Sequence, residues 1–188
     1  MKALVRLMVA LLLVFFIGVS VSAAADKPGD VIRKAMDQAI KIMNDPNLQG
    51  EANQAQLQEE IWKVIRPMFD YIEISKRTLA RNWKKFSRDQ RKEFTESFTE
   101  VLKNTYLTQL KSEYKDVKIN VVGENLVSEN KAQVNTRIVR QDLDVPVDFR
   151  MRLNNDKWRV YDVVIEGISM VKNYRTQFNE LLNKETPD

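Results

Sequence analysis

The stretch VDFRMRLNNDKWRVYDVVI, residues 147 to 165, carries the clearest fold signal in the chain. In its first half apolar and polar residues alternate, which is typical of a strand with one buried face. Asn154-Asn155-Asp156 predicts a tight hairpin turn into a second strand. In that strand the apolar phase begins on Trp158 and later moves to Val163. This shift predicts a bulge near Asp162, and the sheet is therefore expected to be curved.

Two further alternating runs precede this hairpin, at residues 117–121 and 132–138. Together with residues 147–153 and the strand from Lys157 to Ile165, they predict four antiparallel strands. The second face of the predicted sheet carries cationic side chains, so we expect it to face water. Its cations are Lys118, Arg137, Arg150, Arg152 and Arg159.

The residues before the strands have helical periodicity. An amphipathic helix is predicted over residues 30–43, and Asp45-Pro46-Asn47 ends it. A second helix is expected from Leu57 to Met68, interrupted near Pro67, and a short apolar turn is expected at residues 69–74.

Two helix starts carry capping signals. Ser87 and Gln90 form a capping box, and apolar residues at four-residue spacing then predict a helix from Arg88 to about Tyr114. Ser169 is expected to cap a closing helix. Helices first and a meander of strands afterwards give an α+β domain. Its N-terminal helices pack on one face of a curved four-stranded antiparallel sheet, and the C-terminal helix closes it.

The N-terminal 25 residues have the pattern of a secretory signal peptide. Lys2 and Arg6 precede an apolar run over residues 7–19, and Ala23-x-Ala25 offers a cleavage site. We therefore expect residues 1–25 to be removed on export and residues 26–188 to form a single domain. No cysteine follows the apolar run, so attachment as a lipoprotein is not expected.

Composition argues against an enzyme. The 188 residues include no cysteine and no histidine, which removes thiol chemistry and the commonest general base and metal ligand. The best carboxylate pair, Asp162 and Glu166, would be about 13 Å apart along a straight strand, beyond the ~5 to 9.5 Å of glycosidase acid-base pairs. Asp162 is expected instead to bond backbone or an arginine such as Arg175. No catalytic residue and no metal site is predicted, although a small exported hydrolase or isomerase stays open as an alternative.

A basic segment lies between Lys76 and Lys92, with eight cationic residues and one acid. It is either a solvated face or a docking patch for an acidic partner or anionic headgroups. The candidate docking residues are Lys84, Lys85, Arg88 and Arg91. Nucleic acid is not expected as a partner of an exported protein. A structural adaptor that docks through this face is a further alternative.

The stretch WRVYDVVIEGIS, residues 158–169, continued by NYR-x-QF at 173–178, resembles the C-terminal signature of the MlaC family. This family is also called the toluene-tolerance auxiliary component of an ABC transporter. Upstream stretches resemble the same family in the same order: PMFD at 67–70, LARNW at 79–83 and QRKEFTESF at 90–98. Ala80 stands where many relatives have glycine, which bears on the local turn.

The resemblance implies a periplasmic phospholipid carrier and a cone-shaped fold similar to nuclear-transport factors, with an apolar cavity. It implies a monomer with no cofactor and with bound phospholipid as cargo. Its implied partners are an outer-membrane lipoprotein complex and an inner-membrane ABC transporter complex, between which the lipid is shuttled.

Ten residues are candidates to line the implied pocket, although the same side chains could fill a plain core, because an apolar stripe shows only that a face is buried. They come from the long helix, the sheet and the closing segment, and are Phe98, Leu102, Tyr106, Phe149, Met151, Ile165, Ile168, Met170, Tyr174 and Phe178.

Overall fold

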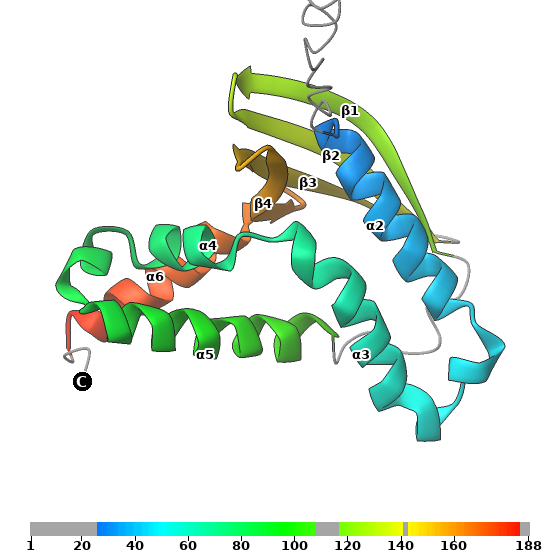
Figure 1. Cartoon of the computed structure of the whole chain (residues 1–188), viewed down its shortest axis with the longest axis horizontal. Helices are drawn as coiled ribbons and strands as arrows, with labels where there is room; N and C mark the ends of the chain where they lie inside the picture. The colour runs from blue at the N-terminus through cyan, green and yellow to red at the C-terminus, as the bar shows by residue number, and fades with distance from the viewer. Residues whose placement is uncertain (1–25, 108–116, 141–142, 185–188) are drawn as a thin grey trace, which may run out of the picture.

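The sheet is an antiparallel meander in the order β1-β2-β3-β4-β5 (Figure 1). The computed structural model describes residues 26–107, 117–140 and 143–184. The strands are β1 (Lys118–Ser128), β2 (Lys131–Arg140), β3 (Leu143–Asn154), β4 (Lys157–Ile165) and β5 (Ile168–Ser169). The four predicted strands are confirmed. The fifth was not predicted, because two residues are too few to show a periodicity.

The β3–β4 hairpin has the predicted turn and the predicted bulge. Asn155 and Asp156 have φ of 50° and 58°, the left-handed conformation that type I′ turns require. Arg150 is paired with Asp162, but Met151 is paired with Val160, so one extra residue of β4 is left between these pairs. The bulge lets side chains on both sides of it face the helical layer.

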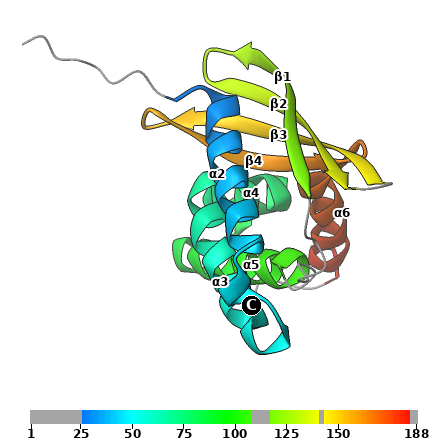
Figure 2. The ribbon, with the colours of Figure 1, turned by 90° about the vertical axis from the view of Figure 1, so that its right-hand side faces the viewer.

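Five α-helices accompany the sheet in the described part of the chain. They are α2 (Pro28–Met43), α3 (Gln54–Ile65), α4 (Tyr71–Leu79), α5 (Arg88–Leu107) and α6 (Met170–Leu182). Figure 2 shows α2 lying along the sheet and the other helices grouped below it. None of the described helices is both long enough and apolar enough to cross a membrane.

The turn expected at residues 69–74 is wrong, because α4 begins there. The Asp70 carboxylate accepts a hydrogen bond from the Glu73 N–H at 3.0 Å and caps the helix. The buried stripe of α4 contains Ser75 and Thr78 as well as apolar residues, so an apolar pattern could not reveal it. The helix ends at Ala80, whose φ of 50° is disfavoured for any residue with a Cβ.

Both predicted caps are present. The Ser87 hydroxyl accepts from the Gln90 N–H at 3.2 Å, and the Gln90 side-chain oxygen accepts from the Ser87 N–H at 2.8 Å. The Ser169 hydroxyl accepts from the Lys172 N–H at 3.0 Å. The predicted end of the long helix near Tyr114 and the predicted signal peptide at residues 1–25 lie outside the described residues.

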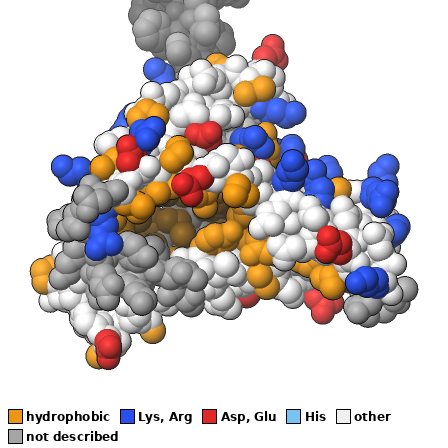
Figure 3. Space-filling view, turned by 180° about the vertical axis from the view of Figure 1, so that it is seen from behind, with side chains coloured by type: hydrophobic (Ala, Val, Ile, Leu, Met, Phe, Trp, Pro, Cys, Tyr) orange, Lys and Arg blue, Asp and Glu red, His pale blue; other side chains and the backbone are white. Residues whose placement is uncertain are grey.

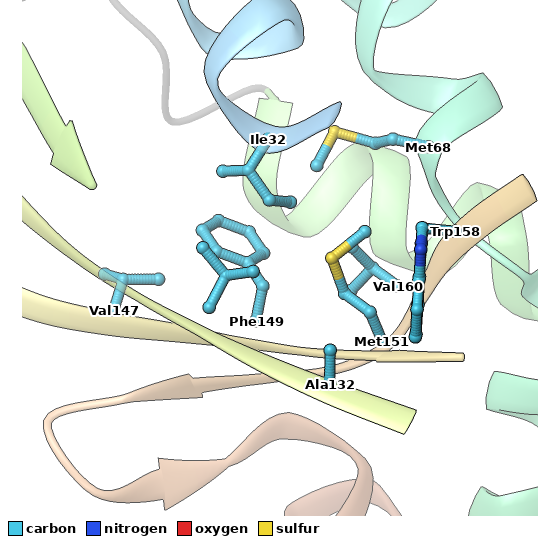
Figure 4. Packing of buried hydrophobic residues seen from close by; sticks show 9 residues of the cluster. Ile32, Met68, Ala132, Val147, Phe149, Met151, Trp158 and Val160 are labelled. Atoms are coloured by element: carbon cyan, nitrogen blue, oxygen red, sulfur yellow. The ribbon is translucent and has the colours of Figure 1, made fainter. Parts of the chain in front are cut away.

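The main core lies between α2 and the sheet (Figure 4). Ile32 of α2 and Met68 point toward the strands, where Met151 is completely buried. Packing of α2 on this side leaves the other end of the sheet for the remaining helices.

The second face of the sheet is only partly open to water. Lys118 and Arg137 are exposed as expected. Arg150 instead pairs with the buried Asp162 at 3.0 Å, and Arg152 pairs with Glu73 of α4 at 2.7 Å. We expected this face to be mostly wet; beside β3 and β4, α4 and the start of α6 instead supply partners and cover.

Candidate functional site

An apolar cavity of about 190 Å³ lies between the sheet and the helices below it. Figure 3 shows a hollow in the surface whose floor consists of hydrophobic side chains. Its described wall contains eleven apolar or aromatic residues and one lysine: Trp62, Ile65, Phe69, Tyr71, Leu102, Lys103, Tyr106, Leu107, Phe149, Val163, Ile165 and Met170.

Regular periodicities bring these side chains together. Leu102 and Tyr106 are four residues apart on α5 and therefore lie on one helical face. Trp62 and Ile65 are three residues apart on α3 and share a face in the same way. On the sheet, Phe149 of β3 is the direct cross-strand partner of Val163 of β4.

Val163 and Ile165 lie on one face of β4, two residues apart. The β4 bulge keeps them on the side of the helices even though the apolar phase before it is set by Trp158 and Val160. The bulge is therefore the local feature that turns the end of β4 toward the cavity.

Tyrosine hydroxyls are the polar groups of the aromatic wall. Tyr71 packs against Trp62 and Phe69, with ring centroids 5.9 and 5.8 Å apart. Burial raises the pKa of Tyr71 above its ordinary value, so its hydroxyl remains a neutral hydrogen-bond donor. Burial, together with a hydrogen bond to Tyr174, also raises the pKa of the partly exposed Tyr106.

Lys103 brings the single charge to the described wall of the cavity. Its Nζ lies 3.0 Å from the Glu59 Oε2 of α3 and 5.6 Å from the centroid of the Trp62 ring. The Lys103 side chain is 25% exposed and that of Glu59 is 49% exposed. The ion pair therefore lies at the border between cavity and solvent.

Five of the ten candidate lining residues lie at the cavity: Leu102, Tyr106, Phe149, Ile165 and Met170. The structure places the other five elsewhere. Met151 is in the core against α2, and Ile168 is 68% exposed on β5. Phe98, Tyr174 and Phe178 belong to an aromatic cluster between α5 and α6.

This aromatic cluster has the geometry of a core. The Phe98 ring meets the rings of Tyr174 and Phe178 edge-on, with centroids 5.0 and 5.4 Å apart. Edge-on aromatic pairs contribute a stabilising free energy in addition to the one that comes from the apolar area they bury. The cluster joins α6 to α5 beside the cavity.

Seven lining residues were not among the candidates: Trp62, Ile65, Phe69, Tyr71, Lys103, Leu107 and Val163. The helical stripe of α3 was visible in the sequence, but nothing local indicated that it faces α5. Lys103 could not be found from an apolar pattern, because lysine counts as a charged residue even when its aliphatic stem lines an apolar wall.

The Asp162 carboxylate has a structural task. It accepts hydrogen bonds from the Val171 N–H at 3.0 Å and the Ser169 hydroxyl at 2.7 Å, in addition to its contact with Arg150. It thereby fastens the start of α6 to β4. The prediction of a backbone and arginine partner is confirmed, but the arginine is not Arg175, whose Nε donates to the Arg77 carbonyl at 2.8 Å.

Glu166 lies in the turn that leads to the closing helix, with φ of 49° beside Gly167 at 82°. Ile165 of β4 and Ile168 of β5 are paired with each other across this turn. Among the described residues, no group of three or more acidic side chains is placed to hold a metal ion.

The candidate docking residues lie around the start of α5. Lys84 and Lys85 belong to the 3-10 turn Ala80–Lys85, and they are exposed together with Arg88. Arg91 is half-buried: its Nε donates to the Trp83 carbonyl at 2.8 Å, and its guanidinium carbon lies 5.3 Å from the centroid of the Trp83 ring. Three of the four cations are therefore presented to solvent, whereas Arg91 helps to hold the turn.

Comparison with known proteins relates most of the chain to one family. The family model described as MlaC protein matches residues 33–188. The chain is 25% identical over 150 residues to the intermembrane phospholipid transport system binding protein MlaC of Haemophilus influenzae, covering 73% of this chain and 70% of that protein. It is 24% identical over 169 residues to the toluene tolerance protein ttg2D of Pseudomonas putida, covering 89% and 78% respectively.

The fold also resembles a solved structure. A phospholipid-binding protein from Ralstonia solanacearum, in complex with a phospholipid, superposes with a TM-score of 0.75 at 20% sequence identity. The match covers 85% of this chain and 89% of that chain. It confirms the α+β arrangement of helices, antiparallel sheet and closing helix.

Proposed function

The chain belongs to the MlaC family, and we propose that it is a phospholipid carrier that holds the acyl chains of its cargo in the cavity below the sheet. The observation that carries this proposal is the cavity wall. Side chains from α3, α5, α6 and the sheet meet there and present almost nothing but apolar and aromatic groups. The H. influenzae relative is named as a phospholipid transport binding protein, and the R. solanacearum structure holds a phospholipid.

An apolar wall is what the task requires energetically. Burial of one methylene is worth about 0.8 kcal/mol, so taking two chains of ~15 methylenes out of a bilayer forfeits roughly 24 kcal/mol. A soluble carrier must replace most of this with apolar contact of its own. Polar surface cannot do so, because it contributes no comparable transfer free energy.

The cavity as described is smaller than such a cargo. An apolar cavity of about 150 Å³ holds one benzene molecule, so a cavity of 190 Å³ has room for only part of one acyl chain. We propose that its walls move apart when lipid is loaded. The wall is built from separate elements that can do this while each keeps its own internal hydrogen bonds.

The chain acts as a binding protein and not as an enzyme. Asp162, one member of the candidate carboxylate pair, is engaged with Val171, Ser169 and Arg150. Its partner Glu166 is exposed in a turn. The hydrolase alternative thus loses its acid-base pair.

The carrier works in the periplasm, after residues 1–25 have directed its export. We expect it to be a monomer that exchanges lipid with an inner-membrane ABC transporter complex and an outer-membrane lipoprotein complex. Exposed Lys84, Lys85 and Arg88 support docking of an acidic partner surface, since like charges gathered on one surface steer encounter. Arg91 contributes by holding this turn in place.

Cargo is tested by purifying the full chain from its periplasmic fraction without detergent and extracting it with organic solvent. Mass spectrometry should find co-purified phospholipid at a fixed ratio to protein. A delipidated and refolded sample should regain that ratio after incubation with phospholipid vesicles. Protein that is empty in both preparations would refute the carrier.

Docking is tested with the triple variant Lys84→Glu, Lys85→Glu, Arg88→Glu. Its affinity for the transporter complex should fall by roughly tenfold or more at low salt, and the deficit should shrink at high salt. The matched control reverses three exposed lysines of the sheet, Lys118, Lys131 and Lys157. Equal loss in both triple variants would show a general charge effect and reject this docking face.

A further inference from the structure

We propose that Lys103 is the residue that recognises the phosphate of the cargo, exchanging its ion pair with Glu59 for one with the lipid phosphodiester. This inference rests on the proposed carrier function and adds a headgroup contact to it. It assigns a ligand class to the rim of the cavity: a diacyl lipid with an anionic phosphate, as opposed to a neutral diacyl lipid.

The position of Lys103 fits this task. Its stem forms part of the cavity wall, while its ammonium group reaches Glu59 at the solvent border. Lysine is suited to such a border because its apolar stem can be buried while its charge stays wet. With the tails of a lipid in the cavity, this proposal places its headgroup at that same border.

The chemistry of the rim selects the phosphate. Among the described residues of the wall, Lys103 alone carries a charge, and its ammonium offers three hydrogen-bond donors. Charge-assisted hydrogen bonds between an ammonium and a phosphate are among the stronger polar contacts in proteins. The Trp62 face, 5.6 Å from the Lys103 Nζ, further favours a cation at this place.

Glu59 acts as the occupant of the site when no phosphate is present. The Glu59 carboxylate forms an ion pair with the Lys103 ammonium at 3.0 Å, but about half of the Glu59 side chain is exposed. Ion pairs in such exposed positions contribute little to stability. A phosphate can therefore displace it at low cost. On this account Glu59 competes with the lipid for Lys103.

A purely structural role makes a different prediction. If the Glu59–Lys103 pair only ties α3 to α5, removing either partner should have the same effect on lipid loading. If Lys103 exchanges partners, the two changes act in opposite directions. Lys103→Met should weaken selection of the phosphate, and Glu59→Gln should strengthen it.

The test uses delipidated full-length protein and lipid vesicles. The vesicles consist of phosphatidylglycerol, with one fifth of the lipid replaced by diacylglycerol that carries the same acyl chains. Lipid loaded onto the protein is quantified by mass spectrometry and normalised to the vesicle composition. Wild type should prefer the phosphate-bearing lipid by roughly tenfold or more, as expected for a charge-assisted contact. Lys103→Met should lose most of this preference, Lys103→Arg should keep it, and Glu59→Gln should increase it.

Lys63→Met is the matched control, because Lys63 forms an ion pair with Glu60 on the same helix but does not line the cavity. It should leave the preference unchanged. A wild type that loads neither lipid refutes the carrier itself. A wild type that loads both lipids without preference, a Lys103→Met variant that keeps the preference, or parallel losses in Lys103→Met and Glu59→Gln would overturn only the role of Lys103.

Discussion

Placing a carboxylate at Ile165 should abolish lipid retention, whereas the same change at Ile168 should not. The two isoleucines are direct partners across the β4–β5 pair, so they share local backbone surroundings. Ile165 lines the cavity and is 37% exposed, while Ile168 is 68% exposed and lies outside it. They therefore form a matched pair that differs mainly in access to the cavity.

The magnitude follows from these exposures. Without lipid, an aspartate at position 165 can still reach water. The substitution should then lower the free energy of unfolding by about 1–2 kcal/mol, because the partial burial of the isoleucine side chain is lost. With lipid in place, acyl chains would cover an ionised carboxylate, and burying such a charge costs several kcal/mol. Even about 3 kcal/mol of this cost weakens retention more than a hundredfold.

The assay compares both variants with wild type. Thermal unfolding should show a drop of about 3–6 °C for Ile165→Asp and a smaller one for Ile168→Asp. Extracted phospholipid per mole of protein should be close to zero for Ile165→Asp and close to wild type for Ile168→Asp. Wild-type lipid content in folded Ile165→Asp, or equal losses in both variants, would refute the placement of the cargo.

Four further changes test parts of the structure by urea denaturation. Asp162→Asn should lower the free energy of unfolding by about 2–3 kcal/mol, because the buried carboxylate fastens the start of α6 and an amide cannot accept all of its hydrogen bonds; no change would dismiss that anchor. Ala80→Gly should raise it by about 1 kcal/mol, since glycine adopts a φ of 50° without strain, and a loss would contradict the assigned turn. Ser87→Ala should lower the free energy of unfolding by about 1 kcal/mol, because α5 loses its N-cap hydrogen bond. Ser97→Ala is the control, because Ser97 lies within α5 and not at its N-cap. Phe178→Ala should cost about 3 kcal/mol but retain lipid, and a specific loss of lipid at unchanged stability would place Phe178 in the pocket instead of the aromatic cluster.

Much of the fold is local and could be predicted. A strand shows itself through alternation, and the phase shift between Trp158 and Val163 was enough to locate a bulge near Asp162. The Ser87–Gln90 box and the Ser169 cap could be predicted because a cap bonds its own helix within three residues. The apolar pattern did not reveal α4, because the buried stripe of this helix includes the small polar residues Ser75 and Thr78.

The candidate site was predictable only in part. Tyr106 and Phe149 lie at the cavity because their elements present apolar faces inward, which periodicity can indicate. Met151 shares a strand face with Phe149, but it packs under α2 and not at the cavity. Periodicity could not separate the two, because it assigns a residue to a face and says nothing of what covers that face.

The order of helices and strands, the turn and bulge of the β3–β4 hairpin, the caps, and the resemblance to the MlaC family all follow from the amino-acid sequence. Which apolar faces meet around a cavity and which close into a core became clear only from the packing of the elements in three dimensions. This packing also brought Glu59 and Lys103, 44 residues apart, to one rim. Helix caps, tight turns and side-chain alternation depend on residues that are near neighbours in the chain, whereas a cavity depends on how distant elements pack, and no local pattern encodes that arrangement.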